Sequence, residues 1–260
     1  MKVKVDGVSL NYELTGQGKT ITLIHGMGDN LHLWDNQVPV FSKKYQVLRF
    51  DTRGFGKSDV PREGYPAEAL PQDVYGLLRA LNIKETHLAG FSMGGVIALR
   101  FALDYPQMVK ALIVVSSSSQ VNPQAIDRYE QRARAAEQEG IQAIATDLER
   151  RFYPGFLQKS PDFLNKYRQQ FLTNDPRGWA MAARSMARYN YTEELARIKC
   201  PTLVIVGEND VSVGVGGSVI ISRRIPGSQL KIVKECGHDI AREKPEEFNG
   251  TVLEFLASVR

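Results

Sequence analysis

Short apolar segments alternate with longer amphipathic stretches along most of the chain. Apolar runs of strand length occupy residues 20–24, 46–50, 87–90, 109–115, 202–206 and 230–233. Apolar residues at helical spacing mark residues 66–81, 94–104 and 246–259. Near the start, two alternating segments flank Asp6-Gly7, which is typical of a hairpin turn. The pattern predicts an α/β fold with a parallel sheet covered by helices on both faces, and a hairpin at one edge.

A different pattern fills residues 121–189. This stretch has no apolar strand run and is typical of about four amphipathic helices, broken at Gly140, Pro154-Gly155 and Asn174-Asp175-Pro176. Its charged residues are interpreted as a solvated helix face: Arg128, Arg132, Arg134, Glu137 and Glu139. A helical insertion between two strands of one sheet predicts a cap over the sheet's C-terminal edge. We therefore divide the chain into a core of residues 1–119 and 191–260 and a helical cap of residues 120–190.

Composition and charge narrow the class of protein. Hydrophobic residues make up 43% of the 260 residues and charged residues 24%, which is typical of a globular chain. The net charge is 33 − 29 = +4, and no run of Lys or Arg suggests a nucleic-acid partner. No apolar stretch approaches the roughly 18 residues of a membrane helix, and no signal peptide is visible. We expect a cytoplasmic protein that binds a small molecule and neither nucleic acid nor membrane; a homodimer stays open.

The cysteines and histidines predict neither a disulfide nor a metal site. Cys200 and Cys236 fall at opposite ends of two predicted neighbouring strands, too far apart for a disulfide, so both should be free thiols. The four histidines are scattered without the spacing of metal ligands. We interpret three of them as structural: His25, His32 and His87.

The segment Gly90-Phe91-Ser92-Met93-Gly94 joins a predicted strand to a predicted helix. Gly-x-Ser-x-Gly in this context is typical of a nucleophile elbow, a turn so tight that the serine takes a strained backbone conformation. The turn lifts the Ser92 hydroxyl above the sheet at the N-terminus of a helix, where developing negative charge is favoured. Ser92 is therefore the predicted nucleophile.

A serine hydroxyl needs a base, and the base needs an acid that holds its tautomer. His238 lies in the loop after the strand of residues 230–233, and Asp210 follows the strand of residues 202–206. Glu208 is the rival acid, and Asp239 is a weaker one. The segment of residues 211–217 contains three glycines, which predicts a poor helix and a mobile loop beside Asp210.

The oxyanion of an acyl-transfer reaction needs at least two N–H donors. The Met93 N–H at the helix start is one, and the Met27 N–H in the loop after the first parallel strand is the other. Gly26 allows the sharp turn that directs Met27 toward Ser92, and His25 is expected to brace the loop by hydrogen bonding. The predicted substrate-binding residues are Gly26, Phe91, Phe152, Phe156, Trp179 and Met181.

These motifs resemble the α/β-hydrolase family in order and spacing over nearly the whole chain. The resemblance is carried by the loop at His25-Gly26, the Ser92 elbow, Asp210, His238 and the segment from Asp51 to Ser58. It implies an eight-stranded, mostly parallel sheet, a helical cap and no cofactor. Asp51 and Arg53 are interpreted as a structural turn with an ion pair. Within the family, the chain looks like carboxylesterases and 3-oxoadipate enol-lactonases.

Three functions follow, of which the first is favoured. A serine hydrolase would cleave carboxylic esters through an acyl-enzyme on Ser92. An enol-lactonase acting on a carboxylated lactone would use the same residues, and a cation such as Arg184 or Arg188 facing Ser92 would favour it. A small-molecule receptor or signalling partner with retained catalytic residues is the third. Ser92 argues against haloalkane dehalogenases and epoxide hydrolases of this fold, which use an aspartate nucleophile.

Overall fold

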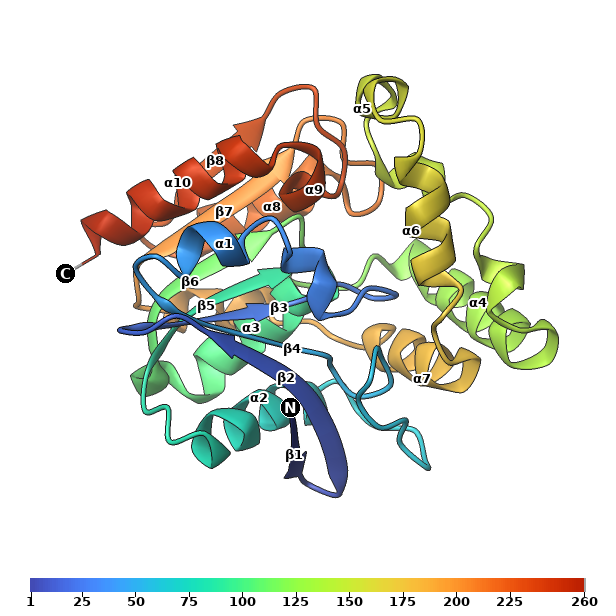
Figure 1. Cartoon of the computed structure of the whole chain (residues 1–260), viewed down its shortest axis with the longest axis horizontal. Coiled ribbons are helices and arrows are strands. Elements are labelled where there is room, and N and C mark those ends of the chain that lie inside the picture. The colour runs from blue at the N-terminus through green and yellow to red at the C-terminus, as the bar shows by residue number, and fades with distance from the viewer. Residues whose placement is uncertain (260) are drawn as a thin grey trace.

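The computed structural model describes residues 1–259 and has one eight-stranded sheet (Figure 1). The strands are β1 (Lys2–Val5), β2 (Val8–Thr15), β3 (Thr20–Ile24), β4 (Gln46–Phe50), β5 (Thr86–Phe91), β6 (Val109–Val115), β7 (Thr202–Gly207) and β8 (Gln229–Val233). Their order is β1-β2-β4-β3-β5-β6-β7-β8. Strands β3 to β8 are parallel, while β1 and β2 form an antiparallel hairpin. The predicted sheet and its N-terminal hairpin are thus confirmed.

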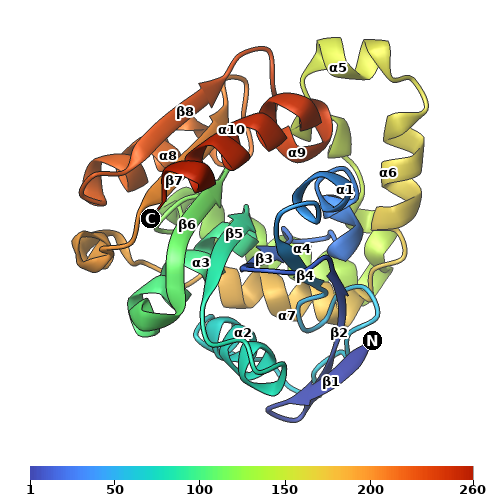
Figure 2. The same cartoon turned by 60° about the vertical axis from the view of Figure 1, so that its left-hand side comes forward.

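Helices cover both faces of the sheet (Figure 2). One face carries α2 (Ala69–Ala80), α3 (Met93–Asp104) and α8 (Gly214–Arg224); the other carries α1 (Val38–Phe41), α9 (Ile240–Glu243) and α10 (Pro245–Ser258). Successive side chains of a strand point to opposite faces. Accordingly, Leu48 packs into the α2–α3 layer, whereas Val47 packs into the α1–α10 layer. Strands β3 to β7 are buried on both faces, which is why they appear in the sequence as nearly continuous apolar runs.

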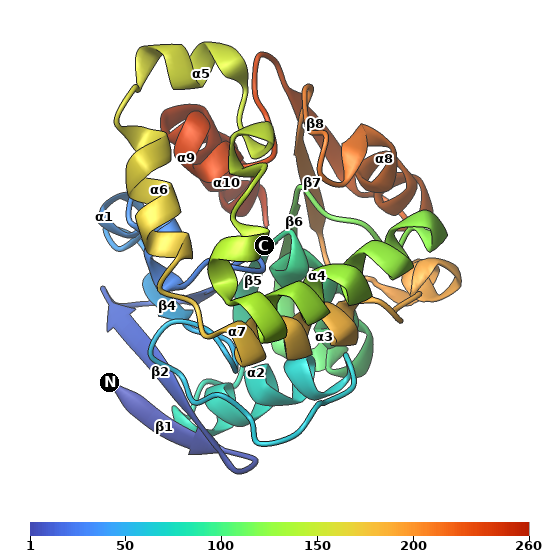
Figure 3. The ribbon, with the colours of Figure 1, turned by 90° about the vertical axis from the view of Figure 1, so that its right-hand side faces the viewer.

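Four α-helices lie between β6 and β7 in the chain: α4 (Ile126–Glu139), α5 (Pro154–Lys159), α6 (Phe163–Phe171) and α7 (Pro176–Met186). Figure 1 places them together on one side of the sheet, and in Figure 3 α4 runs alongside α7. Gly140 ends α4, while Pro154 and Pro176 occupy the first helical positions of α5 and α7. Below we call this segment, residues 120–190, the cap segment.

Six short 3-10 helices complete the described elements. Their bounds are Leu31–Trp34, Pro106–Met108, Pro123–Ala125, Ile141–Ile144, Leu148–Arg151 and Thr192–Arg197. Cys200 and Cys236 are both free, as the strand arrangement predicts. No helix in residues 1–259 combines the length and the apolar character needed to cross a membrane.

Helix α8 corrects the expectation of a poor helix after Asp210. The helix begins at Gly214, inside the glycine-containing segment. Before it, one carboxylate oxygen of Asp210 accepts the N–H groups of Ser212 (2.8 Å) and Val213 (3.2 Å), which fixes the turn. Gly217 then passes so close to the neighbouring chain that a Cβ would lie 3.1 Å from the Ser117 carbonyl oxygen. Tertiary contacts therefore stabilise a helix that intrinsic propensity disfavours.

Candidate active site

Ser92 lies in a sharp turn between β5 and α3. Its backbone has φ +53° and ψ −115°, a conformation that costs a non-glycine residue about 1–3 kcal/mol. The flanking glycines permit it: a Cβ at Gly90 would lie 2.0 Å from the Gly94 carbonyl oxygen, and one at Gly94 would lie 2.3 Å from that of Ile24. The turn is also held by a 2.9 Å hydrogen bond from the Ser92 N–H to the Val115 carbonyl. The strained turn predicted from the sequence is present.

Asp210 and His238 follow β7 and β8 and are both buried. His238 Nδ1 lies 2.8 Å from Asp210 Oδ2, while the other oxygen of Asp210 accepts the N–H groups described above. Burial by itself raises the pKa of Asp210, but the His238 ring and the two N–H donors outweigh it, and the net shift is downward. Asp210 is therefore a carboxylate fixed on both oxygens, with one of them aimed at the imidazole.

The loop after β3 runs directly beside Ser92. A Cβ placed on Gly26 would lie 2.9 Å from the Phe91 ring and 3.2 Å from the Ser92 Cβ, so only glycine fits this approach. The N–H groups of Met27, next in the loop, and of Met93, at the first position of α3, donate no hydrogen bond within residues 1–259. Both N–H groups are therefore unpaired, and their role as oxyanion donors stays a prediction.

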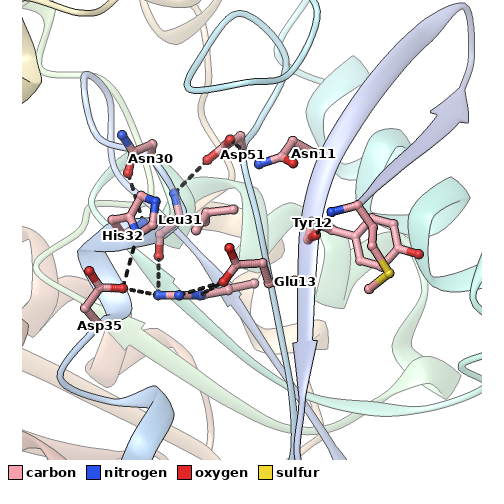
Figure 4. A network of polar contacts seen from close by, with 10 residues as sticks. Asn11, Tyr12, Glu13, Asn30, Leu31, His32, Asp35 and Asp51 are labelled. Carbon is pink, nitrogen blue, oxygen red and sulfur yellow. Dashed lines mark hydrogen bonds and ion pairs between the residues drawn. The ribbon is translucent and has the colours of Figure 1, made fainter.

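Polar contacts brace the far part of this loop (Figure 4). Asp51 Oδ1 accepts the Leu31 N–H at 2.7 Å, and Arg49 donates to the Leu31 carbonyl at 3.1 Å. Arg49 is in turn bonded to the carboxylates of Glu13 and Asp35. The loop is thereby tied to β2 and β4, which gives Asp51 the structural role expected of it.

His25 and Arg53 serve the same framework. His25 accepts the Thr52 N–H at Nε2 (2.9 Å), so Nδ1 carries the proton and donates to the Gly26 carbonyl (2.7 Å). Burial lowers the pKa of His25, which favours this neutral bracing form. Arg53 forms its ion pair with Asp73 of α2 through two hydrogen bonds of 2.5 and 2.6 Å.

Ser92 and His238 line one cavity of about 240 Å³, which also contacts the cap segment. Met27, Met93 and Trp179 line it as well. Of the predicted substrate-binding residues Trp179 lines this cavity, whereas Gly26 does not. The remaining lining residues are Val96, Ser117, Ser118, Arg128, Tyr129, Arg132, Asp147, Leu148, Arg150, Arg151, Phe171, Met186, Tyr189, Val211, Ser212 and Val213. The cavity is therefore built from the sheet's C-terminal edge and from helices inserted far away in sequence.

Other predicted binding residues lie elsewhere. Phe91 is fully buried, with its ring 4.8 Å from that of His238, so it packs under the imidazole. Phe152 and Phe156 belong to an aromatic cluster with Phe163 in the cap segment. Met181 lines a second cavity, of about 490 Å³, on the other side of α7. The structure does not bring these residues into the cavity with Ser92, because they pack in the layers around it.

Four arginines line this cavity although the sequence pattern did not predict them there: Arg128, Arg132, Arg150 and Arg151. Arg132, which was assigned to the solvated face of its helix, is half-buried, and its guanidinium lies 5.5 Å from the Trp179 ring centre. Its Nε is buried without a hydrogen-bond partner. Burial lowers the pKa of Arg132, and the nearby positive charges of Arg128 and Arg151 lower it further. Asp147 is the one acidic residue among the lining residues, so positive charge is in excess on this wall of the cavity.

Neither of the two cations that would favour the enol-lactonase by facing Ser92, Arg184 and Arg188, lines the cavity with Ser92. Arg184 is bonded to Glu130 and Glu137, and Arg188 lines the second cavity. The spacing of Arg128 and Arg132 is the signal that could have found the correct side, since residues four apart share one helix face.

The fold and this arrangement define the class of protein. The sequence profile of the alpha/beta hydrolase fold matches residues 19–245, and the chain belongs to that family. The 3-oxoadipate enol-lactonase 2 of Acinetobacter baylyi is 32% identical over 248 residues, 94% of this chain and 92% of that protein.

Two solved structures are similar over almost the whole chain. The enol-lactonase from Burkholderia xenovorans LB400 has a TM-score of 0.94 at 28% identity, covering 99% of this chain and 100% of that one. A thermophilic esterase from Thermogutta terrifontis, solved with malate bound, has a TM-score of 0.95 at 30% identity, covering 100% and 99%. The predicted family is confirmed, and both an enol-lactonase and an esterase are similar to the chain over almost its whole length.

Proposed function

We propose that this protein is a serine hydrolase that cleaves carboxylic esters or lactones through an acyl-enzyme on Ser92. One observation carries the proposal: a serine in a strained elbow shares a cavity with a histidine whose Nδ1 lies 2.8 Å from a buried carboxylate. This combination supplies a nucleophile, its base and the acid that orients the base.

The reaction follows from these groups. His238 Nε2 removes the Ser92 hydroxyl proton while Oγ attacks the carbonyl carbon, and the negative charge moves to the carbonyl oxygen. The N–H groups of Met27 and Met93 stabilise that oxyanion, each contributing about 3 kcal/mol. His238 then gives its proton to the leaving alkoxide as the ester bond breaks. A water molecule repeats the sequence on the acyl-enzyme, releases the acid and restores Ser92.

The arginines of the cavity favour a substrate that carries a negative charge, such as a carboxylate. Arg128 and Arg150, both exposed, form no ion pair within residues 1–259, and Arg132 donates to the Ile144 carbonyl but has a buried unpaired Nε. Because a planar guanidinium binds carboxylates in a bidentate manner, an anionic substrate would satisfy these donors. The enol-lactonase relatives and the esterase solved with malate, a dicarboxylic acid, agree with this preference. A carboxylated lactone is thus the favoured substrate, with neutral short-chain esters as the second candidate.

The nucleophile is tested by Ser92→Ala. We expect the variant to lose about 10⁴-fold or more of kcat on p-nitrophenyl acetate and on lactones, because no other group can form the acyl-enzyme. Turnover that survives the substitution would refute the assignment of Ser92.

Substrate charge is tested in the same assay with paired esters that differ only in a free carboxylate or its methyl ester. Arg132→Gln should raise KM for the carboxylate more than KM for the methyl ester. Arg134→Gln is the matched control, since Arg134 lies on the same helix, is exposed and pairs with Glu130. Equal effects of Arg132→Gln on both members of the pair would leave the neutral ester as the better candidate.

A further inference from the structure

Glu243 lies behind the loop that carries His238 and is only 6% exposed. Its two carboxylate oxygens accept three backbone N–H groups. Oε2 accepts from Tyr153 (2.8 Å) and Gly237 (2.9 Å), and Oε1 accepts from Asp239 (3.1 Å). Two of these donors immediately precede and follow His238, while the third lies in the cap segment. A single side chain therefore joins the histidine loop to the cap segment.

Backbone contacts strengthen this junction. The His238 N–H donates to the Arg151 carbonyl at 2.7 Å. A Cβ on Gly237 would lie 2.6 Å from that same carbonyl oxygen and 2.7 Å from the Tyr153 nitrogen, so no side chain separates the two segments. Residues 151–153 and the histidine loop are consequently in direct contact along their backbones.

The same short segment reaches the substrate side. Arg151 lines the cavity with Ser92, and its guanidinium donates to Asp29 Oδ2 at 3.2 Å. Asp29 follows Met27 closely in the loop after β3, and Arg242 of α9 holds its other oxygen at 2.9 Å. Residues 151–153 thus contact the cavity, the Met27 loop and the His238 loop.

No cation within residues 1–259 pairs with the buried carboxylate of Glu243. The side chain forms no ion pair within residues 1–259, and burial raises its pKa to about 7 although three N–H groups act in the opposite direction. Desolvating a carboxylate is costly unless its hydrogen bonds are made. The three hydrogen bonds from backbone N–H groups are therefore what offsets the desolvation of the Glu243 carboxylate. Breaking one of them should disturb the loop that carries His238.

We propose that Glu243 is a positioning residue for His238. It positions the imidazole by hydrogen bonding both to the histidine loop and to residues 151–153 of the cap segment. The proposal rests on the proposed function for its catalytic consequence. The position of the imidazole, however, can be measured without any substrate.

The test is Glu243→Gln with Glu246→Gln as the matched control, since Glu246 is exposed on α10. Glutamine keeps the shape but has one acceptor oxygen, so its NH₂ group would face an N–H donor. We expect kcat to fall about 10- to 100-fold on active sites counted with a serine-reactive phosphonate, while KM changes less. A role in stability alone would lower the melting temperature and leave kcat per counted site at the control value.

A spectroscopic measurement separates this proposal from the proposed function. The His238 ring proton between Nδ1 and Asp210 gives an NMR resonance that should shift in Glu243→Gln and stay in place in Glu246→Gln. Suppose that the unmodified protein and both variants hydrolyse neither esters nor lactones, and that the resonance still shifts in Glu243→Gln. The proposed function then fails, while the positioning role of Glu243 stands. A resonance and a kcat that both match the control would overturn the positioning role.

If Glu243→Gln does not fold, amide hydrogen exchange in the unmodified protein tests the proposal instead. The N–H groups of Tyr153, Gly237 and Asp239 lie outside strand ladders, yet they should exchange slowly because Glu243 accepts all three. Exchange as fast as that of exposed loop amides would contradict the proposal.

Discussion

At the scale of single residues, geometry separates three carboxylates that the sequence places near His238. Glu208 is exposed. Asp239 directs Oδ2 to Arg242 at 2.6 Å. Only Asp210 directs a buried oxygen to His238 Nδ1, at 2.8 Å. The order of residues along the chain favoured Asp210, but only the contacts exclude the rivals.

Asp210→Asn should lower kcat by about 10⁴-fold with little change in folding, because the amide no longer holds the imidazole in the tautomer that accepts the Ser92 proton. Hydrolysis of an ester substrate across pH measures the effect. Glu208→Gln serves as the control and should retain activity. A loss confined to Glu208→Gln would make Glu208 the acid.

At the scale of elements, α7 separates two cavities and touches the core through its backbone. Trp179 lines the cavity with Ser92, whereas Met181, two positions later, lines the other, since residues two apart on a helix point to different sides. At the helix start, a Cβ on Gly178 would lie 2.4 Å from the Gly54 carbonyl oxygen in the loop after β4. The helix is therefore seated on the core at a point where a side chain cannot fit.

Gly178→Ala should reduce the free energy of unfolding by about 1–3 kcal/mol, because the added methyl group forces two backbones apart. Gly250→Ala is the control on α10, where a Cβ meets nothing within 4 Å. That variant should be stabilised by about 0.5–1 kcal/mol through helix propensity. Denaturant unfolding of both variants measures the difference, and equal destabilisation would show that the close approach has no consequence.

At the scale of the whole molecule, buried ionisable groups make stability depend on pH. Glu243 has its pKa raised from 4.5 to about 7 by burial. Between these values the folded state keeps the proton while the unfolded state has lost it, so the folded state binds more protons. Stability from this group is therefore present at low pH and lost as pH rises through this range.

The free energy of unfolding of the unmodified protein, measured against that of Glu243→Gln, should accordingly decline as pH rises from about 4.5 to about 7. Denaturant titrations at several pH values within this range provide the measurement. A difference between the two proteins that is constant with pH would mean that Glu243 titrates near its ordinary value.

The sequence by itself determined the parallel sheet, the hairpin and the positions of Ser92, Asp210 and His238. These features depend on local patterns: apolar runs of strand length, glycines around one serine, and polar residues just after strands. Because the carboxyl ends of parallel strands share one edge, such loops must meet wherever the sheet forms.

Only the tertiary structure decided which cap residues reach the cavity. Whether Arg132 faces solvent or lines the cavity, and whether Phe152 lines the cavity or packs among other aromatic rings, depends on how whole helices are rotated against the core. The start of α8 and the three donors to Glu243 depend on it too, because these contacts join segments far apart in the chain. Local sequence patterns do not specify how a helix is rotated against the core. Close packing of side chains in the tertiary structure fixes that orientation.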